Sequence, residues 1–202
     1  MKLTPKKEER LRKKIKKYRS HLTAEKRRFG FFDDSSGVRY LLPAIYIQLE
    51  DYKGGLTYLR WFNKNFPDDV GYPIFLFEWA LILYKVGKLK DAELKIIQTF
   101  FENSYLLDKF FGRAVKALEK YEYSNWSTVE LTKYFEYSSS QEEFEDFSDW
   151  LNNVEQSESF RKTRDRFIEL ERQLLVEKNT DKRGKILEEI RFLQSPEGYP
   201  PN

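Results

Sequence analysis

The chain has 202 residues, of which 40% are hydrophobic and 17% aromatic, enough to fill the core of one folded domain. It contains no cysteine, which excludes disulfides, thiolate metal sites and cysteine nucleophiles. The net charge of +3 conceals a strong segregation. Residues 1–28 hold thirteen Lys or Arg and three Glu, a local charge of +10, so the remainder carries −7.

The sequence lacks the motifs of common catalytic and nucleotide-binding sites, including GxxxxGK[ST], GxGxxG and GxSxG. The single histidine, His21, has only Glu25 as an acidic neighbour, too little for a triad or a histidine metal site. No apolar run approaches the roughly 18 residues of a membrane span, and the N-terminus lacks the features of a signal peptide. We therefore expect a cytoplasmic, non-catalytic protein with no membrane span, no cofactor and no metal.

The first predicted helix begins at Thr4-Pro5, a good N-cap followed by a proline, and runs to about Arg19. Residues 23–28 either extend this helix or begin a second turn. Its apolar residues recur at spacings of four and three and form one narrow stripe: Leu11, Ile15, Tyr18 and Leu22. The remaining faces are cationic. The candidate contacts with a polyanion are Lys6, Lys7, Arg10, Lys13, Lys14, Lys17, Lys26, Arg27 and Arg28.

This basic arm has several interpretations. It would bind nucleic-acid phosphates, although it lacks a recognised base-reading motif. Its stripe is narrow for a membrane-surface helix. It would also suit the chain's own acidic region, residues 136–158, or serve only as a solubilising tail.

Residues 37–112 contain one pattern twice: a helix, a turn, and a second helix with a small residue near its start. In the first copy the turn falls at Asp51-Tyr52 and the small residue is Gly55. In the second copy the turn falls at residues 87–89 and the small residue is Ala92. The turns lie about 37 residues apart, close to the 34-residue period of the tetratricopeptide repeat, which this stretch resembles.

The resemblance implies two stacked helix pairs with large side chains around the small residues: Leu42, Tyr46 and Leu59 in the first pair, and Trp79, Leu83 and Ile96 in the second. Pro67 matches the terminal proline of the repeat, whereas Ser104 replaces it in the second copy. Pro43 departs from the pattern, because a proline inside a helix removes a hydrogen bond. The first helix should therefore begin near Leu42 or be kinked.

Proteins of this family bind partners on the concave surface lined by the first helix of each pair. The matching groove positions are Tyr40, Ala44, Ile47 and Gln48 in the first repeat, and Phe77, Leu81, Tyr84 and Lys85 in the second. Such an apolar, aromatic groove suits an amphipathic helix or peptide of another protein. Relatives that clamp a terminal carboxylate use Lys and Asn at positions that here are Tyr40, Ala44, Phe77 and Leu81, which disfavours that mode. The alternative occupant is the chain's own C-terminal or N-terminal helices.

A degenerate third unit is predicted to cap the stack, with a helix over residues 105–121 and a short helix over residues 128–135. A short acidic helix follows over residues 141–154. Helices over about 157–177 and after Asn179 should pair antiparallel, and the tail from Gln194 should fray.

Four carboxylates of the acidic helix recur at helical spacing: Glu142, Glu145, Asp146 and Asp149. Such a strip would offer oxygen ligands to a hard cation. It is more commonly a solvated helix face, and no calcium-loop motif accompanies it, so we predict no metal site.

The sequence thus predicts an all-α fold with two recognisable repeats, one degenerate repeat and a C-terminal helical hairpin. The predicted divisions are a basic arm (1–28), a repeat domain (29–137), acidic and then amphipathic helices (138–194), and a flexible tail (195–202). The predicted function is protein–protein recognition as an adaptor or assembly factor, with nucleic-acid binding as the alternative. Self-association is left open.

Overall fold

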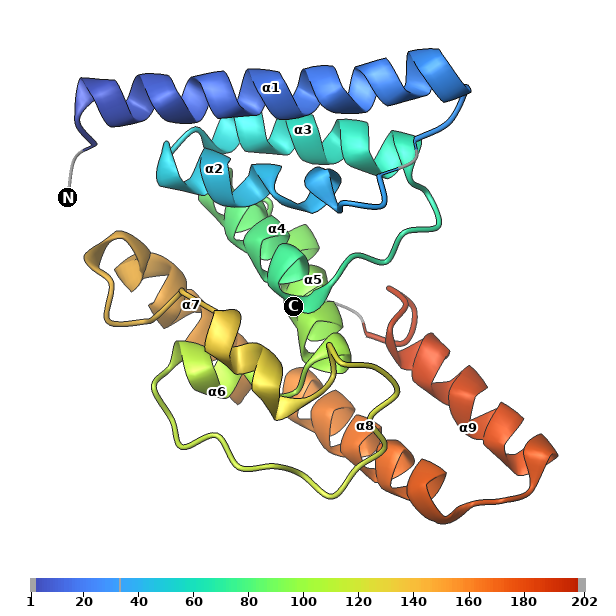
Figure 1. Ribbon diagram of the computed structural model, residues 1–202. Helices are drawn as coiled ribbons and strands as arrows, with labels where there is room; N and C mark the ends of the chain where they lie inside the picture. Colours follow the sequence, from blue (N-terminus) through green and yellow to red (C-terminus); the bar gives the residue numbers. More distant parts are fainter. Residues whose placement is uncertain (1–2, 33, 200–202) are drawn as a thin grey trace.

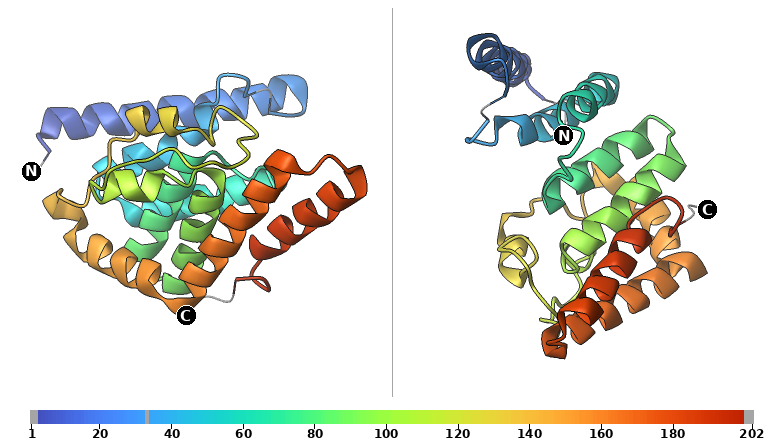
Figure 2. Two further views of the ribbon diagram at one scale, coloured as in Figure 1. Left: turned by 90° about the horizontal axis from the view of Figure 1, so that it is seen from below. Right: turned by 90° about the vertical axis from the view of Figure 1, so that its right-hand side faces the viewer.

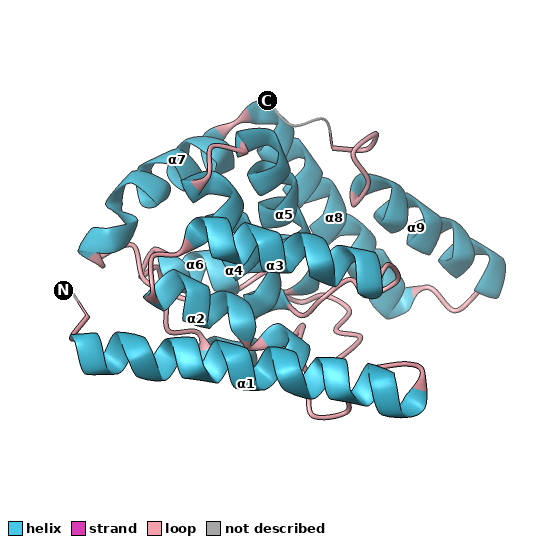
Figure 3. Ribbon diagram, turned by 90° about the horizontal axis from the view of Figure 1, so that it is seen from above, coloured by secondary structure: helices cyan, strands magenta, loops and turns pink. Residues whose placement is uncertain are grey.

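The computed structural model describes residues 3–32 and 34–199, and within these ranges the chain is helical and has no strand (Figures 1 and 3). The α-helices are α1 (Pro5–Phe29), α2 (Leu42–Gln48), α3 (Tyr52–Asn65), α4 (Pro73–Lys85), α5 (Leu89–Glu102), α6 (Leu106–Phe110), α7 (Glu145–Gln156), α8 (Glu158–Val176) and α9 (Thr180–Leu193). Short 3₁₀ helices are η1 (Val38–Tyr40), η2 (Val129–Tyr134) and η3 (Glu142–Phe144). The predicted all-α class is confirmed. No helix in the described part of the chain is long and apolar enough to cross a membrane.

Helix α1 lies along the outside of the first helix pair (Figure 1). It begins as predicted, because the Thr4 side chain accepts a hydrogen bond from the Lys7 backbone N–H and Pro5 occupies the first turn. The helix continues beyond Arg19 to Phe29, so residues 23–28 extend it and do not begin a second turn. No helix breaker precedes Gly30, whose φ of 77° ends the helix. The predicted stripe is buried at Leu11, Ile15 and Leu22 and packs against η1 and α2, so α1 is docked along its length.

Helices α2 and α3 form the first pair. Helix α2 begins at Leu42, so Pro43 lies in its first turn, where the missing N–H of proline costs no helical hydrogen bond. Of the two alternatives for this region, the start near Leu42 is therefore confirmed. The Asp51 side chain caps α3 by accepting a hydrogen bond from the Gly54 N–H at 3.0 Å.

Gly55 allows the first pair to pack closely on α4. A Cβ atom at this position would lie 2.9 Å from the Ile82 Cδ1 atom and 3.2 Å from the Tyr46 Cβ atom. A larger side chain here would crowd Tyr46 within the pair, as expected for close approach of α2 and α3, and would also overlap Ile82 on α4.

Helices α4 and α5 form the second pair, and α4 occupies the centre of the fold, in contact with α2, α3, α5 and α7. Ten of its thirteen residues are buried. A helix that is apolar all round is expected to be enclosed by other elements. The turn after α4 contains Gly87, with a φ of 78°, where glycine is favoured.

The first predicted helix of the third unit is wrong beyond Phe110, whereas the short second helix is present as the 3₁₀ helix η2. Helix α6 ends at Phe110, because Gly112 adopts a φ of 66° and turns the chain away. The predicted helix as far as residue 121 is absent, and residues 113–128 form a loop. The hydrogen bonds that hold this loop include those from the Asn103 Nδ2 atom to the backbone oxygens of Trp126 and Thr128.

The C-terminal helices follow the prediction. Helices α8 and α9 run antiparallel and side by side (Figure 2), and the Arg166 Nε atom lies 2.6 Å from the Glu189 Oε1 atom between them. Helix α8 packs on α5, where the Phe101 and Phe167 ring centroids are 4.4 Å apart.

The predicted fraying from Gln194 is wrong as far as Tyr199. This tyrosine is fully buried, and its hydroxyl donates a hydrogen bond to the Glu93 Oε1 atom at 2.6 Å. Burial of a large ring with a satisfied hydroxyl offsets the entropic cost of ordering the segment. The last predicted tail residues, 200–202, lie outside the described ranges.

Candidate functional site

The half of the predicted groove that belongs to the second helix pair is covered by the chain itself. Phe77 and Leu81 on α4 have no exposed surface. Four rings surround the Phe77 ring at centroid distances of 4.9–5.6 Å: Phe110, Phe135, Tyr137 and Phe147. These positions therefore belong to the core and offer no surface to a partner.

Helix α7 is fixed over this half by polar contacts with the end of α4. The Tyr84 hydroxyl donates to the Asp146 backbone oxygen at 2.9 Å. The Lys85 Nζ atom lies 2.5 Å from Asp146 Oδ1 and donates to the Glu143 backbone oxygen at 3.1 Å. The acidic helix α7 thus forms an ion pair with Lys85 of α4.

The half that belongs to the first helix pair remains partly open. Ala44, Ile47 and Gln48 on α2 line a cavity of about 610 Å³, together with α4 and the segment 131–144 that precedes α7. This volume falls within the roughly 300–1,000 Å³ of ligand-binding pockets. Tyr40 lies apart from these three residues, in η1, and lines a different pocket.

Glu78 on α4 is a buried acid in the wall of this cavity, with 4% of its surface exposed. Its Oε1 atom accepts a hydrogen bond from the Tyr137 hydroxyl at 2.8 Å, whereas its Oε2 atom has no hydrogen-bond partner. Burial raises the pKa of Glu78 to about 8, an effect partly offset by Tyr137 and by the backbone N–H of Ala44.

Glu78 was not among the site residues predicted from the sequence. The available signal was its place as the only acidic residue in the otherwise apolar helix α4, PIFLFEWALILYK. Charged residues are rarely buried unless they are paired, so an acid in such a segment indicates a special environment.

The cavity is more acidic than the predicted groove. Besides Glu78, the acids that line it are Glu50, Glu136 and Glu143, and the described cation in its wall is Lys7. Several walls are apolar, including those made by Ile47, Ile74 and Phe144. The arrangement combines apolar surface with an excess of negative charge.

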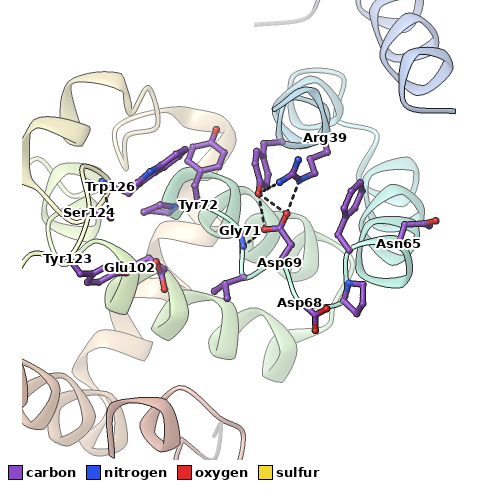
Figure 4. A pocket seen from close by; sticks show the side chains of 15 residues that line it. Arg39, Asn65, Asp68, Asp69, Gly71, Tyr72, Glu102, Tyr123, Ser124 and Trp126 are labelled. Carbon is purple, nitrogen blue, oxygen red and sulfur yellow. Dashed lines mark hydrogen bonds and ion pairs between the residues drawn. The ribbon is translucent and has the colours of Figure 1, made fainter. Parts of the chain in front are cut away.

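A second pocket, of about 730 Å³, lies between the α3–α4 connection and the loop before η2 (Figure 4). Asp69 joins its polar groups: its carboxylate accepts hydrogen bonds from Arg39 Nε and Tyr40 Oη, each at 2.7 Å, and from the Gly71 N–H at 2.9 Å. Burial and Asp69 raise the pKa of Tyr40 to about 12. These groups satisfy one another, so the network stabilises the connection between the two helix pairs.

The cations proposed as polyanion contacts lie on the exposed surface of α1. The ion pairs of α1 that involve its Lys and Arg join residues of the same helix, such as Lys13 and Glu9 at 2.7 Å, or reach Asp51. Among the described residues, no ion pair connects α1 with the acidic region 136–158. The apolar stripe, and not charge pairing with that region, docks this helix.

The remaining acidic candidates have no convergent geometry. The carboxylates of the proposed strip on η3 and α7 are solvent-exposed. In the part of the chain that the structure describes, no three His, Cys, Asp or Glu side chains come together as potential ligands of a metal ion. His21 lies 3.1 Å from Glu25 through its Nε2 atom, one turn along α1.

Comparison with protein-family models, with curated proteins and with solved structures finds no match to this chain. The likeness to the tetratricopeptide repeat therefore stays a prediction that rests on the residues of the two helix pairs.

Proposed function

We propose that this protein is a non-catalytic protein-interaction module of the cytoplasm, in which the cavity between α2 and α4 receives a short segment of a partner protein. The observation that carries the proposal is the incomplete cover of the groove. Phe77 and Leu81 have no exposed surface, whereas Ala44, Ile47 and Gln48 line a cavity of about 610 Å³. A partner segment would therefore meet the first helix pair.

A peptide selection tests the proposal directly. Gln48 is exposed at the cavity wall, so Gln48→Trp would obstruct the cavity without changing the core. The control Lys53→Trp places the same ring on an exposed position of α3. Peptides selected from a displayed random library on the native protein should bind Gln48→Trp at least about tenfold more weakly, a loss of roughly 1.4 kcal/mol.

The same peptides should bind Lys53→Trp with unchanged affinity, as measured by fluorescence anisotropy. The proposal is wrong if no peptide is enriched, or if the enriched peptides bind both tryptophan variants as well as they bind the native protein. Light scattering of each variant checks that a change in oligomeric state does not mimic the loss.

Nucleic-acid binding through α1 is the second candidate, favoured by the exposed cations along this helix. Lys6, Arg10, Lys13 and Lys17 follow one another at spacings of four, three and four, so they share one side of α1. Replacing these four residues by Gln should lower the slope of log K against log salt by about three to four for duplex DNA. An unchanged slope would exclude this surface as the phosphate contact.

A further inference from the structure

The cavity between α2 and α4 contains an unusual acceptor. The Glu78 carboxylate is almost completely buried. Its Oε1 atom accepts a hydrogen bond from the Tyr137 hydroxyl, and the backbone N–H of Ala44 also favours its charged form, but its Oε2 atom has no hydrogen-bond partner. A buried oxygen without a partner costs on the order of 1–3 kcal/mol. Because Glu78 lines the cavity, a guest that enters it is placed to supply the missing donor.

The charge around the cavity selects the kind of donor. Glu50, Glu136 and Glu143 also line the cavity, opposed by Lys7. A cationic donor is therefore favoured over a neutral one, and an anionic guest is disfavoured.

We propose that the cavity binds the side chain of a lysine in the partner segment, with the Glu78 carboxylate as the counter-ion of its ammonium group. This inference rests on the proposed function and specifies the partner residue. Lysine is preferred to arginine because only one oxygen of Glu78 is free. An ammonium group makes compact single contacts, whereas a guanidinium group is best matched by two free carboxylate oxygens.

The walls of the cavity suit the rest of a lysine side chain. Ile47, Ile74 and Phe144 provide apolar surface against which the methylene groups of lysine can pack. The polar Gln48 and Gln141 also lie in the wall. Their side-chain amides can donate hydrogen bonds to the guest backbone and accept hydrogen bonds from it.

Binding of lysine should be coupled to the release of a proton. The empty cavity keeps Glu78 largely protonated at pH 7, since its pKa is raised to about 8. A bound ammonium group favours the ionised carboxylate, so the proton passes to solvent as the ion pair forms. Affinity should therefore rise as the pH increases from 6 to 8 and fall again once lysine itself loses its proton.

Tyrosines and several charged side chains also face the cavity that Glu78 lines. Tyr72 and Tyr137 carry pKa values raised by burial and remain neutral. The other charged groups that line the cavity are Lys7, Glu50, Glu136 and Glu143.

The test uses two small probes and NMR spectroscopy of the full chain. Nα-acetyl-lysine N-methylamide should shift the amide signals of Ala44 and Gln48, whereas the norleucine analogue, which lacks the ammonium group, should bind at least about tenfold more weakly. Glu78→Gln keeps an acceptor for Tyr137 but removes the charge. It should weaken binding of the lysine probe by at least about tenfold and abolish its increase between pH 6 and 8.

Glu188→Gln is the matched control, because Glu188 is exposed on α9, and it should bind the lysine probe as the native protein does. The inference is overturned if norleucine or the arginine analogue binds as tightly as lysine, or if Glu78→Gln has no effect. It is also overturned if spermidine, a free amine, binds more tightly than lysine-containing peptides from the library.

The two proposals fail in different ways. If selected peptides contain no lysine yet lose affinity for Gln48→Trp, the proposed function stands and the lysine inference is wrong. If no peptide is enriched and the lysine probe shifts no cavity signal, both are wrong.

Discussion

The two helix pairs use corresponding surfaces differently. The second pair buries its inner face beneath α7 and residues 135–137, whereas the first pair leaves part of its inner face open to a cavity. Their sequences explain the difference. Helix α4 is apolar on all sides and must be enclosed, whereas α2 is short and ends in the exposed Gln48. The inner face of a helix pair is therefore accessible to a partner only where the chain has not already covered it.

The largest expected effect is the difference in stability loss between a substitution in the covered half of the predicted groove and one in its open half. Phe77→Ala removes a fully buried ring that packs against four others, so the free energy of unfolding should fall by about 3–5 kcal/mol. Gln48→Ala, in the open half, should change it by less than about 0.5 kcal/mol. Urea unfolding followed by circular dichroism measures both, and similar losses would contradict the distinction between the halves.

The next largest effect is the pH dependence of stability that Glu78 contributes. The pKa of Glu78 is raised to about 8 in the folded protein, above its value of about 4.3 in an unfolded chain. Between these values the folded state retains a proton that the unfolded state has lost, so the stability contributed by Glu78 is highest at low pH and falls as the pH rises.

Glu78→Gln removes this dependence. The variant should gain stability relative to the native protein by on the order of a few kcal/mol between pH 5 and pH 8. Urea unfolding of both proteins at pH 5, 6.5 and 8 gives the difference. Other raised acids, such as Glu171, are common to both proteins and cancel. A constant difference across this range would show that Glu78 does not titrate as a buried acid.

A smaller effect tests the close packing of the two pairs. Gly55→Ala places a Cβ atom 2.9 Å from the Ile82 Cδ1 atom, and it should lower stability by about 1 kcal/mol as overpacking outweighs the gain in helix propensity. Gly184→Ala is the control, since Gly184 lies within α9 with open space around it. It should raise stability by roughly 0.5–1 kcal/mol. If thermal or urea unfolding shows that both substitutions change the free energy of unfolding in the same direction, the packing argument is refuted.

The smallest effect tests the contact that holds α7 over the second pair. Asp146→Asn weakens the exposed side of the ion pair with Lys85, and it should cost less than about 1 kcal/mol of global stability. In this variant the α7 amides should nevertheless exchange faster than they do in the native protein, whereas the α5 amides should exchange at an unchanged rate. The reason is that α7 would separate locally from the second pair. If the exchange of the α7 amides is the same in the variant and in the native protein, the aromatic packing around Phe77 alone fixes α7.

Local signals predicted much of this structure. Thr4-Pro5 gave the start of α1, Asp51 and the Gly87 turn separated the helices of each pair, and the apolar period of residues 157–177 gave α8. Two predictions from local signals were wrong. Gly112 ended α6 after five residues although the apolar period continued, and Tyr199 ordered a tail whose composition suggested fraying.

By itself, the sequence determined most of the helices with their caps and turns, because these depend on neighbours within a few residues. Only the tertiary structure decided what covers the groove and what surrounds Glu78. Tyr84 and Asp146 are 62 positions apart, and Glu78 and Tyr137 are 59 positions apart. Contacts at such separations depend on how whole helices pack, and no periodicity in a single segment specifies them.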